Sequence, residues 1–213
     1  MDMHTALILK RMVIVLTAEE LMKKKGIFKQ ELDARTMKSN ELWQKSTEKL
    51  SEIMKHYGEL PKGLQLHINK IFPAAAIYLT VKEELGDKAA FSVIENGAIK
   101  NCAGIEKKLA KLMKIPALPG LFIKMWDPMT RKIFGPDNGF LNVFYPKKKG
   151  EYRMDVTSCP YNRYFTELGC PELTRVFCEN DERVYGNLPG LKFERSGTIG
   201  KGAKCCDFHM KKV

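Results

Sequence analysis

Residues 140–157, FLNVFYPKKKGEYRMDVT, decide the fold class of this chain of 213 residues. Two segments rich in aromatic and aliphatic residues, at 140–145 and 152–157, flank an insert of proline, three lysines and glycine at 146–150. Short strand-like runs on either side of such an insert predict an antiparallel β-hairpin. The second half of the chain is therefore expected to contain a sheet.

The segments after the hairpin predict two short helices and two more strands. We expect the helices at 161–168 and 172–179, and the strands at 191–195 and 204–210. Before the hairpin, a cluster of prolines and a glycine at 116–120 predicts a change from helical to alternating, turn-rich structure.

The first half of the chain is mostly helical in pattern. Thr17 and Glu20 match a capping box, which predicts a short helix that stops at Gly26. Apolar residues at i, i+3, i+4 and i+7 predict a second helix over residues 40–57. Helical spacing then continues from residue 64 to residue 114.

Three positions predict breaks in this long helical stretch. Pro73 is expected to begin a new helix or to kink one, Gly86 followed by Asp87 to end one helix and cap the next, and Gly104 to interrupt the last. The predicted fold is α+β, with a helical N-terminal layer (1–115) followed by an antiparallel sheet with short helices (116–213). We expect the two regions to form one compact unit.

The charge of the chain is high but evenly spread. The formal net charge is +11, and the excess of basic residues is shared between residues 1–120 and residues 121–213. Lysine clusters at 23–25 and 147–149 carry no nucleic-acid-binding motif and are interpreted as solvated faces. Nucleic acid is therefore a disfavoured partner, whereas a positive field attracts small anionic substrates. The sequence leaves homo-oligomerisation open.

The N-terminus shows no targeting signal of the secretory type. Its apolar stretches at 6–9 and 12–16 are separated by Lys10 and Arg11, and no run is long enough to span a bilayer. Without a secretory signal, six cysteines are expected to be reduced thiols in a cytoplasmic protein.

The positions of the cysteines point to chemistry. One cysteine, Cys102, is interpreted as a small buried hydrophobe, while the other five lie in the second half. No CxxC pair is present, so a zinc finger or a ferredoxin-type cluster is not indicated. Thiols near carboxylates favour a nucleophilic enzyme. The alternative is a non-catalytic module that binds a small ligand or a metal through these cysteines, which are Cys159, Cys170, Cys178, Cys205 and Cys206.

Alternation along the last strand limits which groups can meet. Successive side chains of a strand point to opposite faces, so Cys206 and Phe208 share one face while Asp207 and His209 share the other. Cys206 is therefore expected to meet an acid from another segment, such as Asp181. His209 is interpreted as a surface or structural histidine.

Several separated motifs between residues 159 and 208 carry a family resemblance. In order they are CPY (159–161), CPEL (170–173), FCEND (177–181), FERSGTIGKG (193–202) and CDF (206–208). Together they resemble the L-2-amino-thiazoline-4-carboxylic acid hydrolase family, whereas the helical first half carries no such motif. The resemblance implies a hydrolase that acts on the C–N bonds of cyclic amidines and opens their ring, as in the conversion of aminothiazoline carboxylate to a carbamoyl-cysteine. The polar positions that it carries over are Cys159, Cys178, Asp181, Thr198, Cys206 and Asp207.

The resulting hypothesis is a mechanism based on cysteine and aspartate, without a cofactor or a metal. Cys178 or Cys206 attacks the electrophilic ring carbon, and Asp181 or Asp207 moves protons and activates water. Arg195 or a lysine holds the carboxylate of an anionic small-molecule substrate. The expected substrate-binding residues are Cys159, Arg195 and Thr198.

Overall fold

The computed structural model describes residues 16–213. The apolar stretch at 6–9, and all but Leu16 of the stretch at 12–16, lie outside the described residues. Within the described part, no helix combines the length and apolar character that a membrane span requires.

Three helices open the described chain: α1 (Ala18–Lys23), α2 (Gly26–Asp33) and α3 (Ser39–Tyr57). The predicted capping box is confirmed, because the Thr17 side chain accepts from the Glu20 amide while the Glu20 carboxylate accepts from the Thr17 amide. The prediction that Gly26 stops the first helix is wrong. The chain turns at Lys24 and Lys25, and Gly26 begins α2.

Two long helices form the centre of the helical layer: α4 (Gln65–Leu85), which follows a short turn η1 (Lys62–Leu64), and α5 (Asp87–Met113). Gly86 joins them directly with a φ of 82°, a conformation that favours glycine. Helix α4 continues through Pro73, so no new helix begins there, and the predicted interruption at Gly104 does not occur. Pro73 is buried inside α4, where packing against the neighbouring helices compensates for the lost hydrogen bond.

A helix also occupies the region where turn-rich structure was expected. It is α6 (Leu118–Ile133), followed by the turn η2 (Pro136–Asn138). Pro119 lies in the first turn of α6, where the amide that proline lacks has no partner within a helix. The proline cluster therefore begins a helix.

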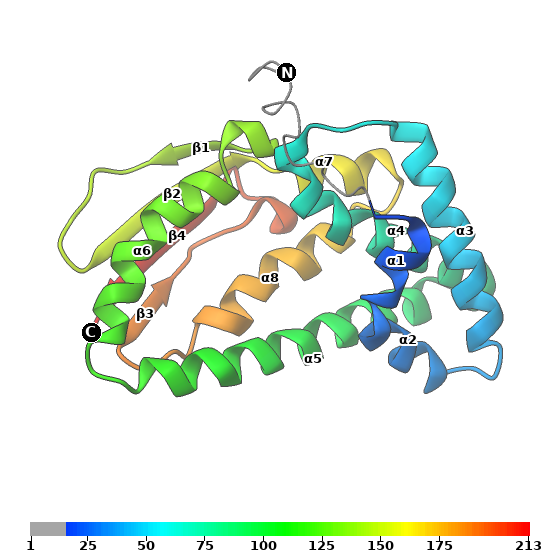
Figure 1. The fold of residues 1–213 in the computed structure, drawn as a ribbon, viewed down its shortest axis with the longest axis horizontal. Helices are drawn as coiled ribbons and strands as arrows, with labels where there is room; N and C mark the ends of the chain where they lie inside the picture. Colours follow the sequence, from blue (N-terminus) through cyan, green and yellow to red (C-terminus); the bar gives the residue numbers. More distant parts are fainter. Residues whose placement is uncertain (1–15) are drawn as a thin grey trace, which may run out of the picture.

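The sheet has four antiparallel strands in the order β1-β2-β4-β3. The strands are β1 (Leu141–Phe144), β2 (Glu151–Ser158), β3 (Leu191–Glu194) and β4 (Cys206–Lys212). The predicted hairpin is confirmed as β1 and β2, and α6 packs against β2 and β4 (Figure 1). An antiparallel sheet that follows a helical layer along the chain confirms the α+β class.

Two further helices, α7 (Pro160–Glu167) and α8 (Leu173–Tyr185), connect the helical layer to the sheet. In Figure 1, α8 lies between the long helix α5 and the strands. Leu173 and Val176 of α8 are fully buried in the core of the helical layer, whereas Cys178 and Tyr185 pack against the core of the sheet. The helical core thus includes residues from both sides of position 115. The division of the chain at that position stays a prediction.

Candidate functional site

A cavity of about 370 Å³ lies at this junction between the helical layer and the sheet. Its walls come from α2 and the turn before it, from α4, α5, α6, α7 and α8, and from β2 and β4. Four of the residues singled out in the sequence line it, and they are Cys159, Cys178, Asp181 and Cys206. The long-range packing of α8 against the sheet therefore gathers motifs that are far apart in the chain.

Cys178 and Cys206 form a thiol pair on the wall of the cavity. Hydrogen bonding from the Cys206 thiol, together with that from the Gly200 amide, outweighs burial and lowers the pKa of Cys178 below its usual range. The same contact raises the pKa of Cys206. The pair thus favours a thiolate at Cys178 and a thiol at Cys206.

The loop before β4 brings its amides to both sulfurs. The Ile199 amide donates to the Cys206 sulfur at 3.2 Å, next to the Gly200 amide that donates to Cys178. This loop, with its single turn η3 (Ile199–Lys201), packs directly on the first turn of α8. A Cβ at Gly200 would lie 2.8 Å from the backbone nitrogen of Arg175, so only glycine allows this approach.

Asp181 lies three residues after Cys178 on α8, so the two side chains share a helix face and line the same cavity. Burial raises the pKa of Asp181, while the opposite charges of Arg195 and Lys70 act against that rise. Arg195 Nη2 is 2.9 Å from Asp181 Oδ2. A carboxyl group with a raised pKa beside a thiolate is suited to proton transfer.

Arg195 does not line the cavity, and its guanidinium binds other groups of the protein. Its side chain is only 5% exposed, and besides Asp181 it donates to the backbone oxygen of Cys178 at 2.8 Å and to that of Asp207 at 3.3 Å. Its guanidinium also stacks 4.1 Å from the ring centroid of Phe208. Arg195 therefore ties β4 to α8.

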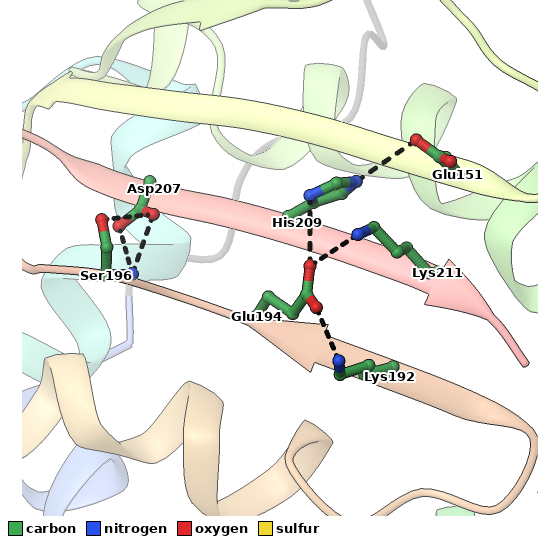
Figure 2. Close-up of polar contacts among 7 residues, drawn as sticks. All are labelled: Glu151, Lys192, Glu194, Ser196, Asp207, His209 and Lys211. Carbon is green, nitrogen blue, oxygen red and sulfur yellow. Dashed lines mark hydrogen bonds and ion pairs between the residues drawn. The ribbon is translucent and has the colours of Figure 1, made fainter.

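Asp207 lies on the opposite face of β4 from Cys206, as the alternation predicts. Its carboxylate accepts the Ser196 amide at 2.8 Å and the Gly197 amide at 2.8 Å, and also the Ser196 hydroxyl (Figure 2). Thr198 follows these residues in the same loop and is buried. The structure brings Asp207 to the loop that reaches the thiols, and not to the cavity.

The rest of this outer face is an ion-pair network. His209 Nε2 lies 3.3 Å from Glu151 Oε2, and His209 Nδ1 lies 3.5 Å from Glu194 Oε2, while Lys192 and Lys211 also bind Glu194 (Figure 2). His209 therefore belongs to a surface cluster and has no contact with the thiol pair.

His67 is a cavity residue that the sequence did not reveal. It lies in a stretch of α4 whose apolar pattern indicates an ordinary buried core, and it is 1% exposed. The Ile133 oxygen at 2.9 Å accepts from Nε2, which leaves Nδ1 to accept the Tyr161 hydroxyl at 3.3 Å. Burial lowers the pKa of His67, so the ring is neutral and both its nitrogens are bound within the protein.

Three lysines, Lys24, Lys25 and Lys70, also line the cavity. The first two belong to the lysine cluster that was interpreted as a solvated face. Within residues 16–213, neither Lys25 nor Lys70 forms a salt bridge with a carboxylate. Burial and the neighbouring lysines lower the pKa of Lys25 to about 8, whereas Lys70 is solvent-exposed. These unpaired cations give the cavity a positive potential.

The remaining cysteines differ from the thiol pair in their positions or in the pKa values of their thiols. Cys102 is buried and lines the cavity, while Cys159, also on its wall, has a pKa raised by burial to about 11. Burial raises the pKa of Cys170 to about 12, and Cys205 lies beside β4 outside the cavity. In the described part of the chain, no three His, Cys, Asp or Glu side chains are grouped so that they could hold a metal ion.

The comparison with known families agrees with this geometry. Residues 65–210 match the model of the L-2-amino-thiazoline-4-carboxylic acid hydrolase family. The chain belongs to this family. The family match begins with α4, so it includes the helical wall of the cavity as well as the cysteine motifs, and it indicates a hydrolase that acts on a small molecule. Searches of curated proteins and of solved structures found no match.

Proposed function

We propose that this chain hydrolyses the cyclic amidine ring of L-2-amino-thiazoline-4-carboxylate or of a related small carboxylate, with Cys178 as nucleophile and Asp181 as proton carrier. The observation that supports this most directly is the placement of the two groups one helical turn apart on α8, facing one cavity. A thiol with a lowered pKa and a carboxyl group with a raised pKa have the properties that the two roles require.

In the first step of this mechanism, the Cys178 sulfur forms a bond to the amidine carbon. The electron pair of the C=N bond moves to the ring nitrogen, which takes the proton of Asp181. The bond from the same carbon to the ring sulfur then breaks, and its electron pair leaves with that sulfur. The bond that opens the ring in this proposal is therefore a C–S bond and not the C–N bond that the resemblance implied. The portion of the substrate that becomes the cysteine of the product now carries a thiolate. It stays bound to Cys178 through a positively charged thiouronium group.

In the second step, the Asp181 carboxylate takes a proton from water, and the hydroxide adds to the same carbon. The bond to Cys178 breaks and returns its electron pair to the sulfur, while the hydroxyl proton passes to the product thiolate. The carbamoyl group is complete, Asp181 is protonated again, and one water has been consumed.

The substrate carboxylate binds Lys70 and Lys25 in this proposal. Neither lysine forms a salt bridge in the described chain, whereas the Arg195 guanidinium is already bound to Asp181 and to two backbone oxygens. A substrate carboxylate would place an opposite charge beside the two ammonium groups. It should therefore raise the lowered pKa of Lys25.

Three other residues act through their neighbours in this scheme. Asp207 holds the loop amides in place, Thr198 is buried in the loop that reaches the thiol pair, and Arg195 orients Asp181. Cys159 keeps its proton and forms part of the wall that contacts the substrate. A cytoplasmic location would keep the thiol pair reduced, as this mechanism requires.

The test replaces Cys178 and Cys206 singly with serine and measures ring opening of aminothiazoline carboxylate. We expect Cys178→Ser to lower kcat by about a thousandfold or more, because serine at this position has no adjacent base. The matched control is Cys205→Ser, which alters a thiol next to Cys206 that does not line the cavity. Full turnover by Cys178→Ser would rule out this nucleophile.

A further inference from the structure

The cavity is larger than the ring named by the family requires. Its volume of about 370 Å³ falls in the ~300–1,000 Å³ range of pockets that enclose drug-sized ligands. Aminothiazoline carboxylate is a single five-membered ring with two small polar substituents. Bound alone, it would leave much of the cavity to water.

The wall around His67 is aromatic and does not offer polar groups to such water. The rings of Phe134 and Phe140 lie 5.2 Å apart, those of Tyr161 and Phe177 also lie 5.2 Å apart, and His67 contacts three of these four rings. The nitrogens of His67 bind Ile133 and Tyr161, so this side of the cavity presents mostly carbon. A ligand that fills it gains free energy by removing apolar surface from water.

A second part of the cavity holds the residues suited to bind an anion and to carry out the reaction. Lys70 interacts electrostatically with Asp181, which lies one turn from Cys178. Lys70 is also solvent-exposed, as are Lys24 and Asn101, and these residues mark the opening of the cavity. His67, Phe140 and Cys206 are buried and mark its interior.

We propose that the preferred substrate is a ring carboxylate that carries a bulky aromatic or branched apolar substituent on the carbon attacked by Cys178. The carboxylate binds the lysines, the reacting carbon lies at the thiol pair, and the apolar substituent fills the aromatic part of the cavity. This inference rests on the proposed function, because it uses the same nucleophile and the same ring chemistry.

The reaction on such a ring follows the same sequence. With a phenyl group at the reacting carbon of a thiazoline carboxylate, Cys178 adds to that carbon and the ring nitrogen takes the Asp181 proton. The ring sulfur leaves with its bonding pair, and a thioimidate to Cys178 remains. Water then adds, the bond to Cys178 breaks, and the product is an N-benzoyl cysteine with a free thiol.

The experiment compares 2-phenyl-thiazoline-4-carboxylate with 2-amino-thiazoline-4-carboxylate on the full chain. Binding of each is measured by calorimetry on Cys178→Ser, and ring opening of each on the unaltered protein. We expect the phenyl compound to bind about tenfold or more tightly, since burying a group of this size typically contributes about 1.5–3 kcal/mol.

Two variants locate the apolar substituent, and a third serves as the control. Ala98→Phe fills the buried part of the cavity wall, and Val156→Phe fills it from β2 if the first variant does not fold. Either should weaken binding of the phenyl compound at least fivefold more than that of the amino compound. The control is Ile99→Trp, on the same helix but outside the cavity.

The outcomes separate this inference from the proposed function. Equal or tighter binding of the amino compound, or an equal effect of Ala98→Phe on both compounds, overturns the substrate class. Tight binding of the phenyl compound without ring opening of either compound supports the substrate class and overturns the proposed function. Turnover that survives in Cys178→Ser overturns the nucleophile alone.

Discussion

The two faces of strand β4 differ in what surrounds them. On one face, Cys206 lies in the wall of a cavity, beside a second thiol and with a loop amide bound to its sulfur. On the other, Asp207 and His209 lie among exposed and half-buried ionic groups (Figure 2). We refer to these as the cavity face and the outer face.

The difference follows from solvent access. On the cavity face each titratable group is poorly hydrated, so a single hydrogen bond or a neighbouring charge changes its pKa strongly. On the outer face water screens the charges, and the ion pairs contribute little individually. Reactivity is therefore expected on the cavity face and structural support on the outer face.

The largest expected effect is that of Asp181→Asn in the cavity. Removing the proton carrier should lower kcat by roughly 10²–10⁴-fold, the usual range for loss of general acid–base catalysis. Steady-state ring opening measures this change. The outer-face comparison is Glu194→Gln, another change of carboxylate to amide, and equal losses in the two variants would contradict the division between the faces.

Next in size is Cys206→Ala, which removes the thiol that donates to Cys178. Because that hydrogen bond lowers the pKa of Cys178, its loss should raise this pKa and move the rising limb of the rate profile to higher pH. At neutral pH we expect about a tenfold loss, which lessens as the pH rises. The rate of Cys178 alkylation against pH reports the same shift without turnover. An unchanged pH profile would show that Cys206 does not set this pKa.

Asp207→Ala on the outer face should affect stability more than chemistry. Burial opposes ionisation of Asp207, but hydrogen bonds from Ser196 and Gly197 outweigh it and lower the pKa. We expect the free energy of unfolding at neutral pH to fall by about 1–2 kcal/mol. Urea denaturation measures this loss.

The pH dependence of that loss has a defined sign. A carboxyl group whose pKa is lower in the folded state stabilises the fold above its unfolded-state pKa of about 3.9, and this contribution disappears as the pH falls through the folded-state pKa. The stability difference between the unaltered protein and Asp207→Ala should therefore shrink in acid. A difference that grows below pH ~4 would contradict the hydrogen-bonded role.

The smallest expected effect is that of Glu194→Gln. The Glu194 carboxylate is bound by Lys192 and Lys211, which lower its pKa to about 2, but it lies on the partly exposed outer face. We expect an unchanged kcat and a melting temperature that shifts less than in Asp207→Ala. A loss of turnover here would mean that the outer face takes part in the reaction.

Several elements could be predicted because their signals are local. The β1–β2 hairpin, the Thr17 cap and the alternation of Cys206 and Asp207 each depend on a few neighbouring residues. Pro73 and the helix α6 could not be predicted in this way, because packing within a core decides whether a proline in a helical pattern breaks the helix.

Prediction of the candidate site from the sequence has the same limit. Four of the predicted site residues lie on the cavity wall, whereas His67 and Lys70 lie in an ordinary helical pattern that carries no signal of a site. Lys25 belonged to a visible lysine cluster, but only the position of the turn between α1 and α2 places it on the cavity.

The sequence by itself determined the α+β class, the faces of β4 and the family, since period-two and helical patterns and motif order are properties of the chain. The tertiary structure decided that the Cys178 and Cys206 sulfurs meet, that loop amides reach them, and that unpaired lysines share their cavity. These contacts join distant segments through apolar packing, which is non-directional, so the periodic pattern shows which face is buried but not which segment covers it.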